Sequence, residues 1–130
     1  MWPARRIAEE LLGRGLGREL LTLLERRVPI EKSALLRVGS MRPGPEDHIR
    51  TIAVVDALQV SSRRIVLVDD VVTRGATLLG CATLLLRVLP RVEIRTFAAV
   101  RTTSGQDIDG MLAAVMGVIT YTNGRLHREP

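Results

Sequence analysis

The segment between residues 73 and 77 combines side chains that favour binding of an anion. Thr73 and Thr77 offer hydroxyl donors, and either can also cap a helix. The guanidinium group of Arg74 has a fork of N–H groups that matches phosphate oxygens. Gly75 allows the main chain to bend closely around an oxyanion. Together these residues indicate a phosphate-binding turn.

Two carboxylates, Asp69 and Asp70, come shortly before this turn. They would repel an anion, so they require a different partner, such as sugar hydroxyls or a cation. A ligand with a phosphate at one end and a diol or a metal ion nearby satisfies both parts of the segment, and ribose 5-phosphate has this shape. A purely structural interpretation, in which the acids only cap a helix, leaves the shared presence of two acids, two threonines and a glycine unexplained.

The flanking sequence predicts the elements that hold this segment. Ile65–Val68 is a run of four apolar residues, which predicts a short strand buried on both faces. Leu78–Arg87 has helical spacing and strong helix formers. The N-terminus of a helix presents unpaired N–H groups and a partial positive charge. We therefore expect the ligand at the carboxyl end of the strand, where the turn leads into the helix.

The thirteen residues Ile65–Thr77 resemble the phosphoribosyl-pyrophosphate binding loop of type I phosphoribosyltransferases. Arg74 stands where threonine is commoner in that family. The resemblance extends to the ComF-like, amidophosphoribosyltransferase-related branch through residues 2–10 and 29–34. It implies a single domain over residues 1–130 with a phosphoribosyltransferase-like, Rossmann-like core.

The resemblance also implies a reaction. Asp69 and Asp70 would hold the 2- and 3-hydroxyls of a ribose and act on a Mg²⁺ ion that is bound through the substrate, without direct ligation. The residues expected around the 5-phosphate are Thr73, Arg74, Gly75, Ala76 and Thr77. A nucleophile displaces pyrophosphate from C1 of the ribose through an oxocarbenium-like transition state. Catalysis then depends on positioning and on electrostatic stabilisation of the leaving pyrophosphate, for which Mg²⁺ is a suitable clamp.

A polar segment at about residues 37–50 is predicted to be a flexible loop, because its two prolines and two glycines oppose regular structure. The resembling family has a flexible excursion at this place, which closes over the active site. Basic residues in and before the segment are therefore candidates to contact pyrophosphate: Lys32, Arg37, Arg42, His48 and Arg50. Lys32 joins Asp69 and Asp70 as a candidate catalytic residue.

The start of the chain leaves two functions open. Members of the family begin with a strand whose following loop receives the pyrophosphate, whereas this chain enters its first helix directly after Met1. The resemblance therefore implies either that the real start lies upstream of Met1 or that this strand and loop have been lost. One function is transfer of the phosphoribosyl group to an unidentified nucleophile. The other is non-catalytic binding of a phosphoribosyl ligand, with a regulatory or ComF-like, DNA-uptake-related role. A receiver-type phosphoacceptor domain is disfavoured, because no lysine follows Asp70.

Composition restricts the partners and the location. The chain has 130 residues, with 46% hydrophobic and 25% charged residues, which is typical of one soluble globular domain. The net charge is +5, but the arginines are scattered and aromatic residues for base stacking are few, so nucleic acid is not an expected partner. The apolar runs are shorter than the roughly 20 residues of a membrane span. The single Cys81 cannot form an internal disulfide. We expect a cytoplasmic protein that binds phosphoribosyl pyrophosphate or a related sugar phosphate, with a homodimer left open.

The remaining periodicity predicts a single α/β domain whose mostly parallel sheet, of about four or five strands, is flanked by helices on both faces. The expected helices, besides Leu78–Arg87, are at residues 4–12, 18–27 and 108–115. Besides Ile65–Val68, strands are expected to start at residues 28–30 and to cover 92–100. Residues 51–55 and 58–60 are expected to form a strand or a hairpin around Asp56-Ala57. Asn123-Gly124 predicts a terminal hairpin.

Overall fold

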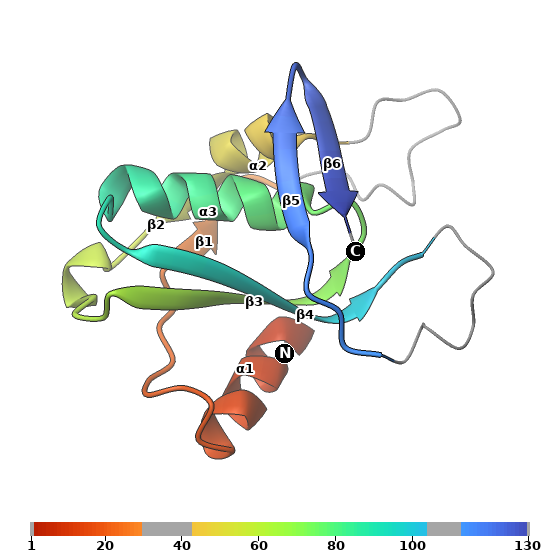
Figure 1. Ribbon diagram of the computed structural model, residues 1–130. Helices are drawn as coiled ribbons and strands as arrows, with labels where there is room; N and C mark the ends of the chain where they lie inside the picture. The colour runs from red at the N-terminus through yellow and green to blue at the C-terminus, as the bar shows by residue number, and fades with distance from the viewer. Residues whose placement is uncertain (1, 30–42, 104–112, 130) are drawn as a thin grey trace.

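The computed structural model describes residues 2–29, 43–103 and 113–129. In these parts of the chain the elements are, in order, α1 (Pro3–Gly13), β1 (Leu24–Arg26), α2 (Pro45–Thr51), β2 (Ile52–Val54), the 3₁₀-helix η1 (Ala57–Gln59), β3 (Arg64–Val72), α3 (Ala76–Val88), β4 (Glu93–Arg101), β5 (Val118–Thr122) and β6 (Arg125–Glu129). The fold is mixed α/β, as expected (Figure 1). No helix in these ranges is long and apolar enough to cross a membrane.

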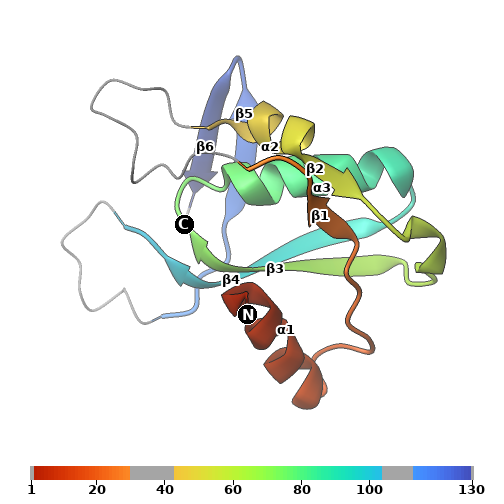
Figure 2. The same cartoon turned by 180° about the vertical axis from the view of Figure 1, so that it is seen from behind.

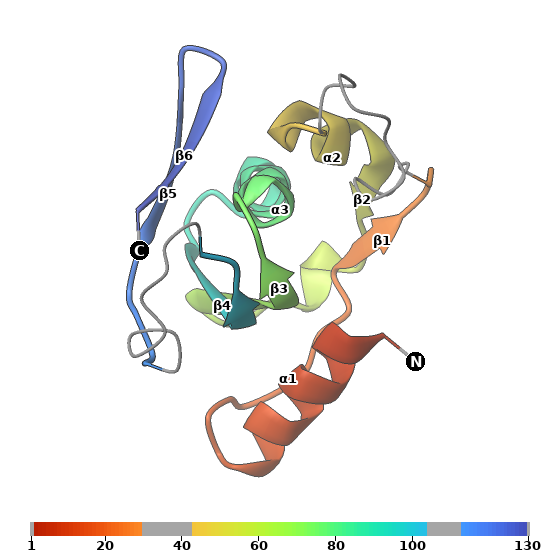
Figure 3. The same cartoon turned by 90° about the vertical axis from the view of Figure 1, so that its right-hand side faces the viewer.

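The centre of the molecule is the strand–helix–strand unit β3–α3–β4. The two strands pair in parallel, from Arg64↔Glu93 to Val72↔Arg101, and the intervening helix supplies the long crossover that parallel strands require. α3 covers one face of this pair, and α1 packs against β3 on the other face (Figure 3). The β5–β6 hairpin lies along one side of α3, whereas α2 and the β1–β2 pair lie on the opposite side (Figure 2). The predicted β-α-β unit is thereby confirmed.

The core is centred on α3. Leu78, Cys81 and Leu85 are buried, and Leu85 is fully enclosed. Their spacing of three and four residues places them on one face of the helix. Leu23, just before β1, completes the buried apolar set among the described residues. The buried face of α3 therefore anchors this helix in the molecule.

The short helix α2 corrects the expectation of an irregular loop at residues 37–50. Pro45 occupies the first helical turn, where a missing N–H group costs nothing and the fixed φ favours the helix. The N–H group of Gly44 donates to Asp47 Oδ2 at 2.8 Å, and Glu46 and Asp47 place negative charge at the positive end of the helix. The proline and glycine thus start a helix here. Residues 37–42 of the expected loop lie outside the described residues.

A glycine in α3 allows α2 to approach closely. A Cβ atom at Gly80 would lie 2.8 Å from the carbonyl oxygen of Pro45 and 2.9 Å from Cβ of His48. Such distances are too short for a real side chain, so only glycine permits this packing. The close contact positions His48 against α3.

Three further expectations about the first half of the chain were not met. Residues 18–27 do not form a helix; instead Leu24–Arg26 is a strand that pairs antiparallel with β2. The four leucines of this segment gather on one side of a helix, but the pairing of Leu24–Arg26 with β2 overrides this local pattern. The strand expected from residue 28 is absent at Val28 and Pro29, and residue 30 is outside the described part. The strand expected at residues 58–60 is replaced by η1, after Asp56 in a left-handed conformation.

The sheets are smaller than expected. The described strands form three separate two-stranded sheets, of which only β3–β4 is parallel. The terminal hairpin is confirmed: Asn123 and Gly124 have φ values of 53° and 73°, which suit the turn of a right-twisted hairpin. Of the helix expected at residues 108–115, only residues 113–115 are described, and they are not helical.

Candidate functional site

The two acids lie near the carboxyl end of β3. Asp69 and Asp70 are both half-buried; the N–H group of Asp70 donates to Asp69 Oδ1 at 3.0 Å, and that of Val71 donates to Asp70 Oδ1 at 3.0 Å. Within the described ranges no arginine or lysine forms an ion pair with either carboxylate. Burial, followed by a side-chain hydrogen bond with Asp70 and by the charge of Asp70, raises the pKa of Asp69 to about 6, and the bond from the backbone N–H group of Asp70 opposes this rise. The pair therefore has capacity for a hydroxyl group or a cation.

The turn from β3 into α3 has free hydrogen-bond donors. Thr73 and Arg74 are exposed, and Gly75 has a φ of 89°, a conformation that glycine adopts without strain. The carbonyl oxygen of Gly75 accepts the first bond of the helix, from the N–H group of Leu79 at 2.9 Å. As far as the chain is described, the backbone N–H groups of residues 73–75 donate to no protein acceptor. The turn thus combines free amides with an exposed guanidinium group next to the start of a helix.

One side of this turn is closed by the terminal hairpin. A Cβ atom at Gly75 would lie 2.5 Å from Cδ1 of Ile119 in β5. The side chain of Arg128 in β6 donates to the carbonyl oxygens of Val72, at 3.1 Å, and Thr102, which follow the two central strands. The space that glycine leaves at this position is therefore occupied by a protein side chain, and an anion has to approach the turn from another side.

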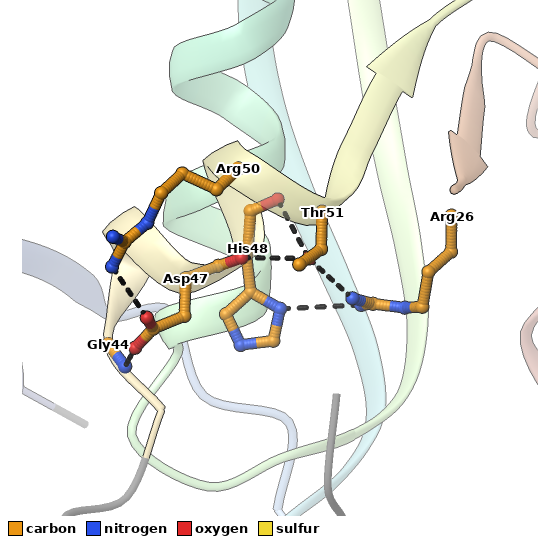
Figure 4. A network of polar contacts seen from close by, with 6 residues as sticks. All are labelled: Arg26, Gly44, Asp47, His48, Arg50 and Thr51. Carbon is orange, nitrogen blue, oxygen red and sulfur yellow. Dashed lines mark hydrogen bonds and ion pairs between the residues drawn. The ribbon is translucent and has the colours of Figure 1, made fainter. Parts of the chain in front are cut away.

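A polar network connects β1 and α2 with the beginning of α3. His48 is only 9% exposed. Its Nδ1 lies 3.3 Å from Nη2 of Arg26, and its Nε2 lies 3.4 Å from Oγ1 of Thr77. Arg26 also donates through Nη1 to the hydroxyl oxygen of Thr51 at 3.0 Å, and this hydroxyl donates to the carbonyl oxygen of Asp47 at 2.7 Å (Figure 4). Burial and the Arg26 charge lower the pKa of His48, and the Asp47 charge opposes them.

Of the five basic residues that were expected to contact pyrophosphate, the structure describes two, His48 and Arg50. His48 is buried between α2 and α3, and it reaches Thr77 of the turn through its ring. Arg50 is exposed on α2 and forms an ion pair with Asp47 at 2.9 Å. The other three candidates, Lys32, Arg37 and Arg42, lie outside the described residues.

Several contributors to this region had no signal in the sequence. Arg26 fell within the helix expected at residues 18–27, and Thr51 at the start of an expected strand. Ile119 and Arg128 belong to a hairpin whose position relative to the turn depends on tertiary packing alone. One local signal was available once α2 was recognised. Thr51 follows Asp47 by four residues, a spacing at which a threonine hydroxyl can donate to the carbonyl oxygen in the preceding helical turn.

A divalent cation fits this region only with help from a ligand. In the described ranges no group of three or more His, Cys, Asp or Glu residues is arranged to hold a metal ion. Asp69 and Asp70 provide the oxygen donors that Mg²⁺ prefers, but Mg²⁺ needs six ligands and commonly takes phosphate oxygens and waters as the others. The donor set is therefore compatible with a cation bound mainly through a phosphorylated ligand.

The fold and site define a mixed α/β protein with a half-buried acid pair beside a helix-initiating turn. No protein-family model, curated protein or solved structure matches this chain.

Proposed function

We propose that the protein binds a phosphoribosyl compound, with phosphoribosyl pyrophosphate as the first candidate, at the carboxyl end of β3. We also propose that β3, α3 and β4 belong to a phosphoribosyltransferase-like, Rossmann-like core. The main support is the half-buried acid pair Asp69–Asp70 next to the turn at residues 73–75. Among the described residues the acids have no basic partner and the turn amides have no acceptor. A ligand that carries a phosphate, with hydroxyls or a bound cation beside it, satisfies both the acid pair and the anion site, and a phosphoribosyl compound has this shape.

The proposed binding mode assigns each part of the ligand. The carboxylates of Asp69 and Asp70 accept hydrogen bonds from the ribose hydroxyls, and Asp69, whose pKa is raised to about 6, is mostly ionised and able to accept such bonds above that pH. The amides of residues 73–75, the guanidinium group of Arg74 and the hydroxyl of Thr77 surround the 5-phosphate. Mg²⁺ is held through phosphate oxygens of the ligand, and it stabilises the charge of a leaving pyrophosphate.

Phosphoribosyl transfer to an unidentified nucleophile is the proposed reaction, and ligand binding without transfer is the alternative. Two of the five basic residues expected to meet pyrophosphate are engaged elsewhere, because Arg50 pairs with Asp47 and His48 is buried against α3. This observation favours the alternative. Both functions require the same sugar-phosphate site.

The acid pair provides the test of binding. We expect wild-type protein to bind phosphoribosyl pyrophosphate with Mg²⁺ in calorimetry, and the double variant Asp69→Asn/Asp70→Asn to lose at least about tenfold in affinity, since each lost charged hydrogen bond is worth about 1.5–3 kcal/mol. Asp56→Asn is the matched control, because Asp56 is exposed and Asn tolerates its left-handed backbone. Equal affinity of the double variant and wild type would remove the role of the acids.

Release of pyrophosphate distinguishes transfer from binding alone. Wild-type protein is incubated with phosphoribosyl pyrophosphate, Mg²⁺ and a panel of amines and bases. Turnover with one of them, lost in the double variant, supports the transferase. Binding with no release above the uncatalysed rate supports the alternative.

A further inference from the structure

The contacts of His48 determine which of its ring nitrogens carries the proton. Arginine has five N–H donors and no acceptor, so Nδ1 of His48, 3.3 Å from Nη2 of Arg26, has to act as the acceptor. A neutral imidazole with an accepting Nδ1 carries its proton on Nε2. The Nε2–H group then points to Oγ1 of Thr77 at 3.4 Å and donates to it.

This donation leaves the hydroxyl hydrogen of Thr77 available. A threonine hydroxyl has one donor and two acceptor positions, and the ring of His48 uses an acceptor position. Within the described residues, the hydroxyl of Thr77 makes no other hydrogen bond. Thr77 is the second residue of α3, at the end of the turn that follows the acid pair. Its O–H group is therefore a donor that finds no acceptor in the described parts of the chain, located where α3 begins.

We infer that Arg26 and His48 act as positioning residues, which fix the hydroxyl of Thr77 as a hydrogen-bond donor for an anionic ligand at the turn between β3 and α3. The inference rests on the proposed function for the identity of that ligand, a sugar phosphate. Arg26 itself is fixed by Thr51, which accepts from its second terminal nitrogen at 3.0 Å (Figure 4). The relay thus runs from β1 through α2 to the first turn of α3.

The relay operates only while His48 is neutral. A second proton would place an N–H group on Nδ1, opposite the N–H groups and the positive charge of Arg26. The groups that act on the ring are Arg26 from β1, which opposes protonation, and Asp47 from α2, which favours it. α3 contributes the thiol of Cys81, whose pKa burial raises to about 11, so that it stays uncharged, and β2 has no titratable side chain.

The alternative is that His48 only fills space between α2 and α3, next to Gly80. Packing alone would not select a tautomer, and it would not make Thr77 sensitive to a change at Arg26. Nitrogen-15 NMR of the imidazole rings distinguishes the two, because the chain has two histidines and His127→Gln leaves the signals of His48 alone.

For the unliganded protein at neutral pH we expect the Nε2–H tautomer of His48. Arg26→Met should shift the ring toward a mixture of tautomers and raise its pKa, since the guanidinium group that holds Nδ1 as an acceptor is removed. Arg27→Met is the matched control, because Arg27 is the neighbouring arginine and pairs with Glu25 at 3.0 Å. An Nδ1–H tautomer in the wild type, or an unchanged ring in Arg26→Met, would overturn the relay.

Binding of ribose 5-phosphate tests the effect on the ligand. Thr77→Val, which keeps the shape and loses the hydroxyl, should lower the affinity about tenfold, whereas Thr77→Ser should stay within about twofold of wild type. Arg26→Met should weaken binding and move its acid limb to higher pH. If Thr77→Val binds like wild type while Asp69→Asn/Asp70→Asn does not, the relay is refuted and the proposed function stands. If wild-type protein binds no ribose 5-phosphate, the ligand role fails with the proposed function, and the NMR result alone decides the tautomer.

Discussion

The carboxyl group of Asp69 is held in surroundings that oppose its charge. Half of it is buried, its nearest charged neighbour is the carboxylate of Asp70, and no basic side chain compensates either acid in the described ranges. Residues with this kind of perturbed ionisation gather at functional sites more often than elsewhere. A bound cation or sugar would remove the unfavourable interaction, so the strain is consistent with a binding role for the pair.

The ionisation of Asp69 leads to a prediction about stability. Folding raises its pKa from 3.8 to about 6, so its contribution to stability is complete below pH 4 and is lost as the pH rises through 6. Asp69→Asn should therefore increase the free energy of unfolding at pH 7.5 by about 1 kcal/mol, after allowance for solvent screening, and change it little at pH 4. Urea denaturation at the two pH values measures this. A loss of stability at pH 7.5 would mean that the carboxylate has a favourable partner.

His48 has the opposite dependence. Its pKa is lowered in the folded protein, so its contribution is complete above the ordinary value of 6.5 and is lost as the pH falls through the lowered value. The difference in unfolding free energy between wild type and His48→Gln should shrink as the pH decreases from 7.5 to 5. The difference between wild type and variant is needed because the ionisation of Asp69 changes the unfolding free energy over an overlapping pH range, with the opposite sign.

At the scale of elements, two glycines determine which segments can pack against α3: Gly75 in the turn before the helix and Gly80 within it. Gly75 receives the side chain of Ile119 from the hairpin, and Gly80 receives the backbone of α2. Both contacts require the absence of a Cβ atom. The sequence indicated that Gly75 was special, but it suggested an oxyanion as the neighbour, whereas the structure places an isoleucine against it.

Gly75→Ala should destabilise the protein by about 2 kcal/mol or more, because a φ of 89° strains an L-residue and the new methyl group meets Ile119. In an Ile119→Ala background the same change should cost about 1 kcal/mol less, since only the backbone strain remains. A double-mutant cycle by chemical denaturation gives the coupling. Strictly additive effects would show that the hairpin does not rest on this glycine in solution.

Gly80→Ala provides a parallel test of the contact between α2 and α3. Alanine normally stabilises a helix interior relative to glycine by about 0.5–1 kcal/mol. Here the methyl group would lie 2.8 Å from the carbonyl oxygen of Pro45, so α2 has to shift and we expect a loss of about 1–3 kcal/mol. Gly13→Ala is the control, because Gly13 lies at the end of α1 and a Cβ atom there would have no other atom within 4 Å. This change should be neutral or slightly stabilising. A gain in stability for Gly80→Ala would contradict the close packing.

At the scale of the whole molecule, the terminal hairpin is joined to the central strands by few contacts. Arg128 bonds the carbonyl oxygens of Val72 and Thr102, and Ile119 packs against Gly75. β3 and β4, by contrast, are covered by α1 on one face and by α3 on the other (Figure 3). Opening of the hairpin therefore leaves the central unit intact, and it would expose one side of the proposed phosphate turn.

Arg128→Met should reduce the hydrogen-exchange protection of β5 and β6 while β3 and β4 keep theirs, because local openings follow the weakest contacts. Arg125→Met is the control, since Arg125 is exposed and makes no ion pair in the described residues. Loss of protection throughout the central strands would show that the hairpin is an integral part of the core.

What the sequence predicted well was local. The apolar run Ile65–Val68 specifies a strand, but its expected burial on both faces is wrong, because Val66 is 49% exposed and the other three residues are half-buried. The helical spacing after Thr77, the apolar and polar faces of α1 and the Asn123-Gly124 turn each specify one element through contacts between near neighbours in the chain. The order of acids, turn and helix that defines the candidate site is likewise a property of one continuous segment, because a strand end and a helix start adjoin in sequence and in space.

Tertiary structure decided the rest. The leucines before β1 suit a helix, but pairing with β2 selects a strand. The sequence cannot tell that Arg26, His48 and Thr77 meet, since they are separated by 22 and 29 residues and come from three elements. The same holds for Ile119 at Gly75. Interactions between near neighbours determine periodicity and turns, whereas the partners of a side chain depend on how separate elements pack.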